Sequence, residues 1–148
     1  MILTFDDLKH YRRQVTMVDG AFDPLHRGHI EYFRAAADRF DLPVLCNVAS
    51  DDYVRTKHTP LLPDDQRAAV IDAIRFISYT HINRLKTETI LAELQPKFYV
   101  KGKDWDGRLP AAEVRVCGDY GIELVYLDTV LDSSSRILKS YTEQQKQR

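Results

Sequence analysis

Short apolar runs alternate with longer amphipathic stretches along almost the whole chain, and this alternation restricts the fold more than any other feature. Five runs have the length and apolar content of buried strands: 15–18, 44–48, 78–82, 97–100 and 122–127. Strands that alternate with helices form βαβ units, in which helices join parallel strands and cover the sheet. The sequence therefore predicts an α/β fold, a Rossmann-like three-layer sandwich with a mostly parallel five-stranded sheet.

Helix signals occupy the intervals between these runs. Helices are predicted over 4–11, 28–40, from 63 onward, over 87–94, 109–120 and 135–145. For the helix that begins at Pro63, the residues expected on the apolar face are Ala69, Val70, Ala73, Ile74 and Ile77. Gly121 is expected to end the helix over 109–120.

The size and composition of the chain predict one compact domain over residues 1–148 and disfavour several other classes of protein. The net charge of -1 gives no basic excess to hold a nucleic acid. No apolar run approaches the ~20 residues of a membrane span, and Asp6 and Asp7 lie where a signal peptide carries basic residues. Cys46 and Cys117 are expected to be buried thiols, so a cytoplasmic location is expected.

The loop after the first predicted strand, residues 20–29, carries two glycines and two histidines. Gly20 allows a tight exit from the strand, and Gly28 lets the backbone approach a ligand at the start of a helix. His26 and His29 are three residues apart, so one helical turn places both imidazoles on the same side. Imidazole N–H groups at a helix N-terminus suit the negative charge of phosphoryl or nucleotidyl transfer.

The two histidines also allow other interpretations, a surface pair without function or a pair of zinc ligands. His10, His58 and His81 are scattered and supply no third ligand at an obvious spacing. The position of the pair directly after a buried strand favours the transfer chemistry. Strand-to-helix loops of a parallel sheet all lie at one edge, which is where ligands bind.

Basic residues follow other predicted strands and are therefore expected at the same edge. Lys57 lies in the loop after the second strand, where a lone lysine is commonly only solvated. Lys101 and Lys103 flank Gly102 at the end of the fourth strand and form either a solubilising edge or a clamp for a substrate phosphate. Arg67 is either structural or ligand-binding.

Two further groups in these loops have both a structural and a functional interpretation. Asp104 and Trp105 either fold the loop after the fourth strand or contact the substrate. The serines 133–135 precede the last predicted helix, where they are usually a cap.

Four segments in order, 20–29, 50–67, 99–105 and 132–137, resemble the cytidylyltransferase-like nucleotidyltransferases, whose signature is HxGH and which include adenylyltransferases. The resemblance covers about residues 15–139. It implies direct attack by a substrate phosphate oxygen on the α-phosphorus of a nucleoside triphosphate. Pyrophosphate leaves, no covalent enzyme intermediate forms, and Mg²⁺ accompanies the triphosphate, with no metal ligands on the protein. Positioning and charge stabilisation then carry the rate.

The resemblance also implies a role for each matching residue. The catalytic residues are His26, His29 and Lys57, the lysine of a loop that closes on the phosphates. The implied nucleotide-binding residues are Gly20, Ala21, Phe22, Asp23, His26, Gly28, His29, Lys101, Gly102, Ser133, Ser134 and Ser135. The implied substrate-binding residues are Asp19, Lys57, Arg67, Lys103, Asp104 and Trp105.

Two subfamilies match best, and they differ in nucleotide and acceptor. Residues 100–105 resemble the heptose-1-phosphate adenylyltransferases, whereas 102–108 resemble the glycerol-3-phosphate cytidylyltransferases. Lys103 adds a positive charge that neither pattern usually carries, and 128–131 lack the arginine that the cytidylyltransferases have there. ATP and a sugar- or polyol-phosphate acceptor are therefore favoured, with CTP and glycerol 3-phosphate as the alternative.

Three more distant possibilities fit the residues less well. Phosphopantetheine adenylyltransferases carry threonine at the position of His26, and aminoacyl-tRNA synthetases need a KMSKS-like stretch that is not present. A non-catalytic, nucleotide-binding regulatory domain is disfavoured because both histidines and Lys57 are present. The expected partners are a nucleoside triphosphate and a small phosphorylated substrate, without nucleic acid or membrane, and the sequence leaves a homodimer open.

Overall fold

The computed structural model of the protein describes residues 1–128 and 134–147. In chain order the elements are β1 (Ile2–Leu3), η1 (Phe5–Tyr11), β2 (Thr16–Gly20), α1 (Arg27–Arg39), β3 (Val44–Ala49), α2 (Asp51–Arg55), α3 (Asp64–Asp72), β4 (Tyr79–Asn83), α4 (Thr87–Leu94), β5 (Phe98–Gly102), η2 (Lys103–Trp105), α5 (Ala111–Tyr120), β6 (Glu123–Leu127) and α6 (Ser134–Lys146). The two η elements are short 3-10 helices.

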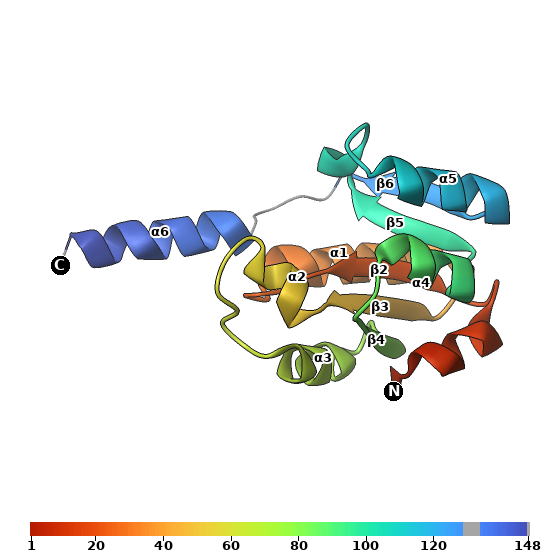
Figure 1. Cartoon of the computed structure of the whole chain (residues 1–148), viewed down its shortest axis with the longest axis horizontal. Helices are drawn as coiled ribbons and strands as arrows, with labels where there is room; N and C mark the ends of the chain where they lie inside the picture. Colours follow the sequence, from red (N-terminus) through yellow and green to blue (C-terminus); the bar gives the residue numbers. More distant parts are fainter. Residues whose placement is uncertain (129–133, 148) are drawn as a thin grey trace.

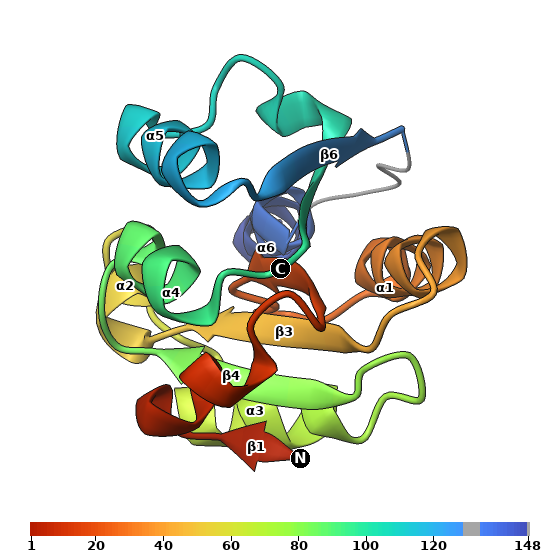
Figure 2. The same cartoon turned by 90° about the vertical axis from the view of Figure 1, so that its right-hand side faces the viewer.

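A parallel sheet forms the middle layer of the molecule (Figures 1 and 2). Its six strands lie in the order β1-β4-β3-β2-β5-β6, and every neighbouring pair is parallel. The predicted α/β sandwich is confirmed, and the five predicted strands correspond to β2–β6. The additional strand, β1, has only two residues. A segment that short has no periodicity for a sequence pattern to detect.

Helices cover both faces of the sheet, as Figure 2 shows from the side. Helices α1 and α3 pack on one face through a cluster that includes Phe33 and Ile71. Elements η1, α4 and α5 pack on the other face through a cluster that includes Cys117. The adjacent residues Leu45 and Cys46 of β3 belong to opposite clusters, as alternation along a strand requires. Both cysteines are buried free thiols, as predicted.

Strand β2 lies where the strand order reverses, with β3 on one side and β5 on the other. Pairing of β2 with β3 runs from Thr16 to Gly20, whereas β2 and β5 are in register only at Thr16 and Met17. Beyond Met17, the Tyr32 hydroxyl of α1 bridges the two strands: it accepts from the Asp19 N–H (3.3 Å) and donates to the Val100 carbonyl. The reversal creates the crevice in which open parallel sheets bind ligands.

The apolar face predicted for the helix that begins at Pro63 is correct only at its end, where Ile77 is buried and Ile74 packs against the core, both just beyond α3. Within α3 itself the buried face differs from the predicted one. Val70 is 48% exposed and Ala69 is also exposed, whereas Ala68 and Ile71 are buried. The helix is rotated about its axis relative to the prediction, because the side chain of Arg67 is also buried, against the loops at the carboxyl edge of the sheet. The apolar periodicity of this helix was therefore a poor guide, since a buried arginine occupies part of the inner face.

The remaining helices follow the predictions with two changes. The first predicted helix is the 3-10 helix η1, and its start is closed by Asp7, whose carboxylate accepts from the Thr4 N–H (2.8 Å) and hydroxyl (2.9 Å). Helix α2 was not predicted, and the Ser50 hydroxyl caps it by accepting from the Tyr53 N–H (3.3 Å). Gly121 ends α5 in the left-handed region at φ 65°, as predicted.

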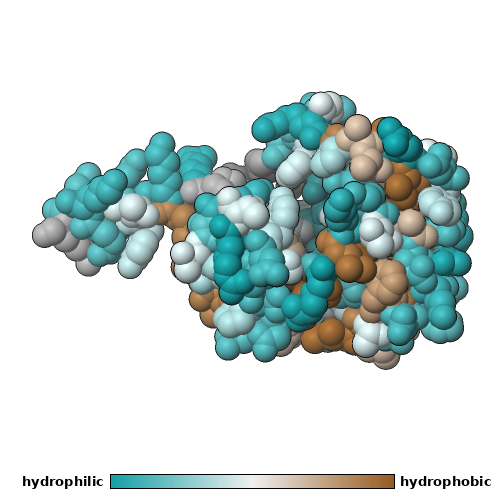
Figure 3. All heavy atoms as spheres, in the orientation of Figure 1, coloured by the Kyte–Doolittle hydropathy of each residue, from teal (hydrophilic) through white to brown (hydrophobic). Residues whose placement is uncertain are grey.

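Helix α6 extends away from the body of the molecule (Figure 1). In the space-filling view the same arm and most of the visible face are hydrophilic (Figure 3). None of the described helices has the length and apolar character needed to cross a membrane.

Candidate active site

The histidine loop, defined as residues 20–29, leads from β2 into α1. His26 caps α1: its Nδ1 accepts from the Gly28 N–H (3.0 Å), and the Nδ1 of His29 accepts from the His26 N–H (3.2 Å). The two imidazole rings stack with centroids 3.7 Å apart and planes 27° from parallel. The predicted arrangement of both imidazoles on one side of the helix start is present.

These hydrogen bonds determine the tautomer of each histidine. A neutral imidazole carries one proton, so an Nδ1 that accepts a hydrogen bond leaves that proton on Nε2. Burial, with a smaller effect from the charge of His26, lowers the pKa of His29 to about 3, so His29 is neutral at neutral pH. Because each Nδ1 is an acceptor, the N–H donor of each ring is on Nε2, beside the positive end of a helix dipole.

Phe22 belongs to the core and is not placed to contact a nucleotide. It is 4% exposed, and its ring lies edge-on to His29 and Phe33, with centroids 4.9 and 5.1 Å away. A Cβ on Gly20 would lie 2.9 Å from the tip of the Phe22 ring, so glycine is needed there for packing. Phe22 has φ 53° and adopts the left-handed region, which costs a residue with a side chain about 1 kcal/mol or more. Phe22 thus supports the imidazole of His29 from behind.

Asp23 is also structural, since its carboxylate holds the loop that follows Lys57. It is 1% exposed and accepts from the N–H groups of Leu61 (2.8 Å) and Leu62 (3.2 Å). Nε2 of His58 lies 3.1 Å from the same carboxylate. The predicted contact of Asp23 with a nucleotide is not supported by this position.

Arg67 ties the same loops together from α3. Its side chain is 1% exposed and donates to the carbonyl oxygens of Leu62 (3.0 Å), Ala21 (2.8 Å) and Ala49 (2.7 Å) and to the Asp51 carboxylate (2.8 Å). A guanidinium with these partners and almost no exposed surface is not placed to bind a substrate, so Arg67 is structural. We call Asp23 and Arg67 the loop clasp, because they join the loops after β2, β3 and α2.

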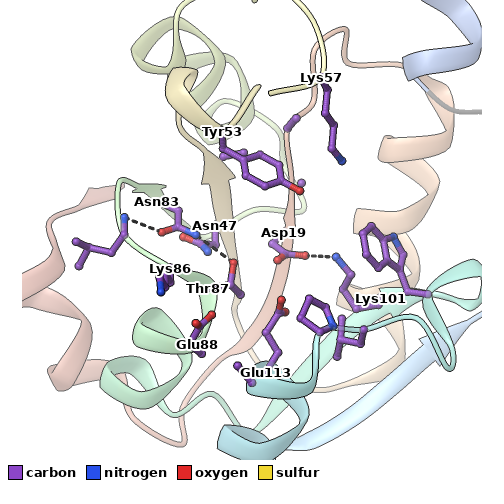
Figure 4. Close-up of a pocket in the computed structure, with 18 residues that line it drawn as sticks. Asp19, Asn47, Tyr53, Lys57, Asn83, Lys86, Thr87, Glu88, Lys101 and Glu113 are labelled. Atoms are coloured by element: carbon purple, nitrogen blue, oxygen red, sulfur yellow. Dashed lines mark hydrogen bonds and ion pairs between the residues drawn. The ribbon is translucent and has the colours of Figure 1, made fainter. Parts of the chain in front are cut away.

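A cavity of about 420 Å³ opens at the carboxyl edge beside the histidine loop. Its charged lining residues are Asp19, Lys57, Lys86, Glu88, Lys101 and Glu113. Its neutral lining residues include Gly20, Ala21, Asn47, Tyr53, Asn83 and Trp105. Figure 4 shows Lys57 and Tyr53 on one side of the cavity and Glu88 and Glu113 on the opposite side.

Strand alternation explains which face of the sheet the cavity occupies. Asp19, Asn47 and Lys101 each lie two residues after a core residue of their strand, and that core residue packs toward α4 and α5. Leu45, two residues before Asn47, is an example. The side chains of Asp19, Asn47 and Lys101 therefore lie on the α4 and α5 side of the sheet, whereas α1 covers the opposite side. The histidine loop and the cavity meet at Gly20, which belongs to both.

Lys101 is the buried cation of the cavity. Its Nζ lies 2.6 Å from Oδ1 of Asp19 and 4.3 Å from the centroid of the Trp105 ring. Asp19 and Trp105, which the resemblance implied to bind the substrate, therefore lie beside Lys101, which it implied to bind the nucleotide. Lys57, on the other side, is exposed and lies over the Tyr53 ring at 5.2 Å from its centroid.

Tyr99 connects this ion pair to α5. Its hydroxyl lies 2.8 Å from Oδ2 of Asp19 and 2.8 Å from Oε1 of Glu113. Burial, reinforced by the charges of the two acids, raises the pKa of Tyr99 well above its ordinary value, so the phenol stays protonated. Burial likewise raises the pKa of Glu113.

Two amides in the cavity are held by neighbours. Oδ1 of Asn47 lies 2.9 Å from Nδ1 of His81, whose pKa burial lowers to about 4, so this neutral imidazole donates from Nδ1 and leaves the Asn47 amide N–H groups available. Asn83 donates to the Thr87 hydroxyl (3.2 Å) and accepts from the Leu85 N–H (3.1 Å).

The other predicted site residues lie outside the cavity or outside the described side chains. Lys103 and Asp104 are exposed on η2 and do not line the cavity, and Lys103 pairs with the exposed Asp128 at 3.3 Å. Gly102 ends β5 immediately before η2. Ser133 lies outside the described residues, and Ser134 and Ser135 are described only as the start of α6.

Sequence reasoning missed Asn47, Asn83, Glu88 and Glu113. Asn47 carried a detectable signal, since a single amide in the apolar run 44–48 has no reason to be buried unless it is used. The two glutamates and Asn83 carried none, because acids and amides at helix starts and strand ends are common on solvated surfaces. Among the described residues, no three histidine, cysteine, aspartate or glutamate side chains form a metal-ligand group.

The sequence of the chain is similar to a known family and to several known proteins. The cytidylyltransferase-like family model matches residues 17–139. The chain is 31% identical over 142 residues to the bifunctional protein HldE of Trichlorobacter lovleyi and 33% identical over 141 residues to that of Geobacter sulfurreducens. These matches cover 90% and 89% of this chain but only 28% of each relative, so the chain spans under a third of their length.

Solved structures support the fold. The lipopolysaccharide core biosynthesis protein of Thermoplasma volcanium matches with a TM-score of 0.68 and 23% identity over 79% of this chain and 98% of that one. The pantothenate synthetase of Thermus thermophilus matches with a TM-score of 0.60 and 16% identity over 88% of this chain and 62% of that one. At these identities the likeness concerns the arrangement of strands and helices alone.

Proposed function

The chain belongs to the cytidylyltransferase-like family, and from that premise we propose that it is a nucleotidyltransferase that moves AMP from ATP to a sugar or polyol phosphate and releases pyrophosphate. The match to proteins named HldE and the likeness of residues 100–105 to heptose-1-phosphate adenylyltransferases support this choice of nucleotide and acceptor. The chain then acts on two phosphorylated small molecules at one edge of its sheet.

The donor half of the site is the histidine loop. Two Nε2–H donors and the start of α1 suit the oxygens of a triphosphate, whose negative charge shifts toward the leaving pyrophosphate during transfer. His29 is neutral at neutral pH and donates a hydrogen bond without first releasing or taking up a proton. Mg²⁺ enters with the triphosphate as part of the substrate and offsets its charge.

The acceptor half is the cavity on the α4 and α5 side. Lys101 and Lys57 attract an anionic phosphate, and the amides of Asn47 and Asn83 suit sugar or polyol hydroxyl groups. A phosphate oxygen of the acceptor, held near Gly20, attacks the α-phosphorus in line with the departing pyrophosphate. Such a reaction needs positioning and charge stabilisation and no enzyme nucleophile.

One observation carries the proposal: a helix start with two histidine donors and a cavity lined by lysines share Gly20 and Ala21 at the point where strand order reverses. A regulatory nucleotide-binding domain needs the donor half, the histidine loop, but has no use for the acceptor half, the cavity. The pairing of both halves favours transfer between two bound substrates.

The proposal is tested by measuring pyrophosphate release with ATP, CTP, GTP or UTP and, in turn, heptose 1-phosphate, glycerol 3-phosphate or phosphopantetheine. We expect ATP with heptose 1-phosphate to give the highest kcat/KM. CTP with glycerol 3-phosphate as the best pair would instead establish the cytidylyltransferase alternative, which residues 102–108 resemble. No release with any pair, together with tight nucleotide binding, would support a regulatory domain.

A further inference from the structure

The hydroxyl of Tyr99 has more acidic neighbours than it can satisfy. It lies 2.8 Å from a carboxyl oxygen of Asp19 and 2.8 Å from one of Glu113. A hydroxyl donates a single hydrogen bond, so only one of these oxygens receives the phenol proton. The other contact needs a second proton, because two oxygens at that distance without one repel each other. One of the two carboxyl groups must supply it.

The charges around the two acids indicate which of them holds that proton. Asp19 has the ammonium group of Lys101 at 2.6 Å and is the ionised partner. Glu113 is 8% exposed, and its burial raises its pKa. The negative charges of Asp19 and Glu88 also raise this pKa, whereas the hydrogen bond from Tyr99 and the charge of Lys101 lower it. The groups that face Glu113 come from several elements: Asp19 of β2, Tyr99 and Lys101 of β5, Glu88 of α4, Cys117 of α5 and Tyr126 of β6.

The state of Glu113 sets the charge of the cavity wall. With Glu113 protonated, Lys101 and Asp19 cancel and the wall formed with Tyr99 is neutral. With Glu113 ionised, the same wall carries one net negative charge in a partly buried setting. Coulombic repulsion in such a setting is worth far more than in bulk water, and a phosphorylated acceptor is itself an anion.

We propose that Glu113 is a positioning residue that sets the charge of the acceptor cavity. Its carboxyl group holds a proton against Tyr99 when a phosphorylated acceptor binds, so that Asp19 stays paired with Lys101 and the wall offers no net negative charge. Glu113 acts through Tyr99 and Asp19 and does not touch the reacting atoms. This inference rests on the proposed function in one respect, namely that the ligand of the cavity is a phosphorylated molecule.

The consequence is that acceptor binding is linked to protonation. Because the protonated form binds, acceptor affinity is retained below the pKa of Glu113 and falls as the pH rises through it, by up to tenfold per pH unit. The acceptor phosphate also ionises near pH 6, but that effect belongs to the ligand and is shared by every variant. The difference between wild type and a variant isolates the contribution of Glu113.

Titration calorimetry of glycerol 3-phosphate and heptose 1-phosphate between about pH 5 and 9 tests the proposal. We expect Glu113→Gln, which keeps a neutral hydrogen-bonding side chain, to remove the pH dependence that exceeds ligand ionisation. Glu88→Gln removes an acid of the same cavity that does not touch Tyr99 and whose charge only adds to the raised pKa of Glu113, so it is expected to keep the pH dependence and to move its midpoint to lower pH. If Glu113→Gln does not fold, Tyr99→Phe removes the shared hydroxyl and is expected to shift the midpoint of the profile.

Three results would overturn the inference: identical pH profiles for wild type and Glu113→Gln, the same loss of pH dependence in Glu88→Gln, or no binding of either probe to wild type. The proposed function fails on a different measurement, the absence of pyrophosphate release with every nucleotide and acceptor. Binding that depends on Glu113 without any pyrophosphate release would therefore reject the transferase and leave the charge-setting role in place.

Discussion

The histidine loop and the cavity meet at one edge of the sheet, but they are built in opposite ways. The histidine loop is one continuous segment, and backbone N–H groups hold both of its imidazoles. The cavity takes single side chains from separate elements, and side chains such as Tyr99 hold them in place. A continuous segment can be recognised as a motif, whereas a site assembled from single residues becomes visible only when the chain is folded.

The loop clasp joins the two regions, and breaking it gives the largest expected effect. Arg67→Ala removes a buried guanidinium from one carboxylate and three carbonyl groups and is expected to cost about 3–5 kcal/mol of stability. Arg55→Ala, which breaks the exposed pair with Asp52, is the matched control and is expected to cost less than about 1 kcal/mol. Urea unfolding measures both, and equal costs would show that the clasp does not hold the loops.

Removing a donor from the histidine loop is expected to have the next largest effect. His29→Ala is expected to lower kcat about 100- to 1,000-fold, because the lost hydrogen bond stabilises the transition state. His10→Ala, an exposed histidine on η1, is the control. Steady-state pyrophosphate release measures both variants, and near-normal turnover in His29→Ala would contradict a catalytic histidine loop.

A matching change in the cavity is expected to act on the other substrate. Lys101→Ala is expected to raise the KM of the acceptor about tenfold or more with little change in the KM of ATP, since it removes a cation from the acceptor side. The exposed Lys103 does not line the cavity, so Lys103→Ala is expected to change the acceptor KM less than about threefold. A larger effect at Lys103 would place the acceptor outside the cavity.

Acid is expected to weaken both regions, through His29 in the histidine loop and through His81, which holds the cavity residue Asn47. The pKa values of His29 and His81 are lowered from 6.5 to about 3 and about 4. Between these values and 6.5 the unfolded chain binds more protons than the folded one, so stability falls as the pH is lowered below 6.5. Each histidine contributes a loss of about 1 kcal/mol for the first pH unit. Unfolding at two pH values should show this slope, and His81→Gln should reduce it.

The same contrast explains how much of the molecule the sequence predicted. Five of the six strands and the histidine pair were predicted from local patterns, because the alternation of apolar runs with amphipathic stretches and the position of a loop can be recognised from neighbouring residues. The roles of Asp23, Arg67 and Phe22 did not follow, since each is decided by contacts far away in the chain, such as Asp23 with Leu62. Glu113 was not noticed at all, because only the packing of α5 brings it to Tyr99.

The central claim, transfer of the α-phosphorus of ATP to a sugar or polyol phosphate, is tested most directly by following labelled phosphorus. ATP labelled at the α-phosphate or at the γ-phosphate is incubated with heptose 1-phosphate and the enzyme, and the products are separated. The account predicts that the α-label appears in the acceptor product and the γ-label in pyrophosphate. Transfer of the γ-label to the acceptor, or its release as inorganic phosphate, would contradict the account.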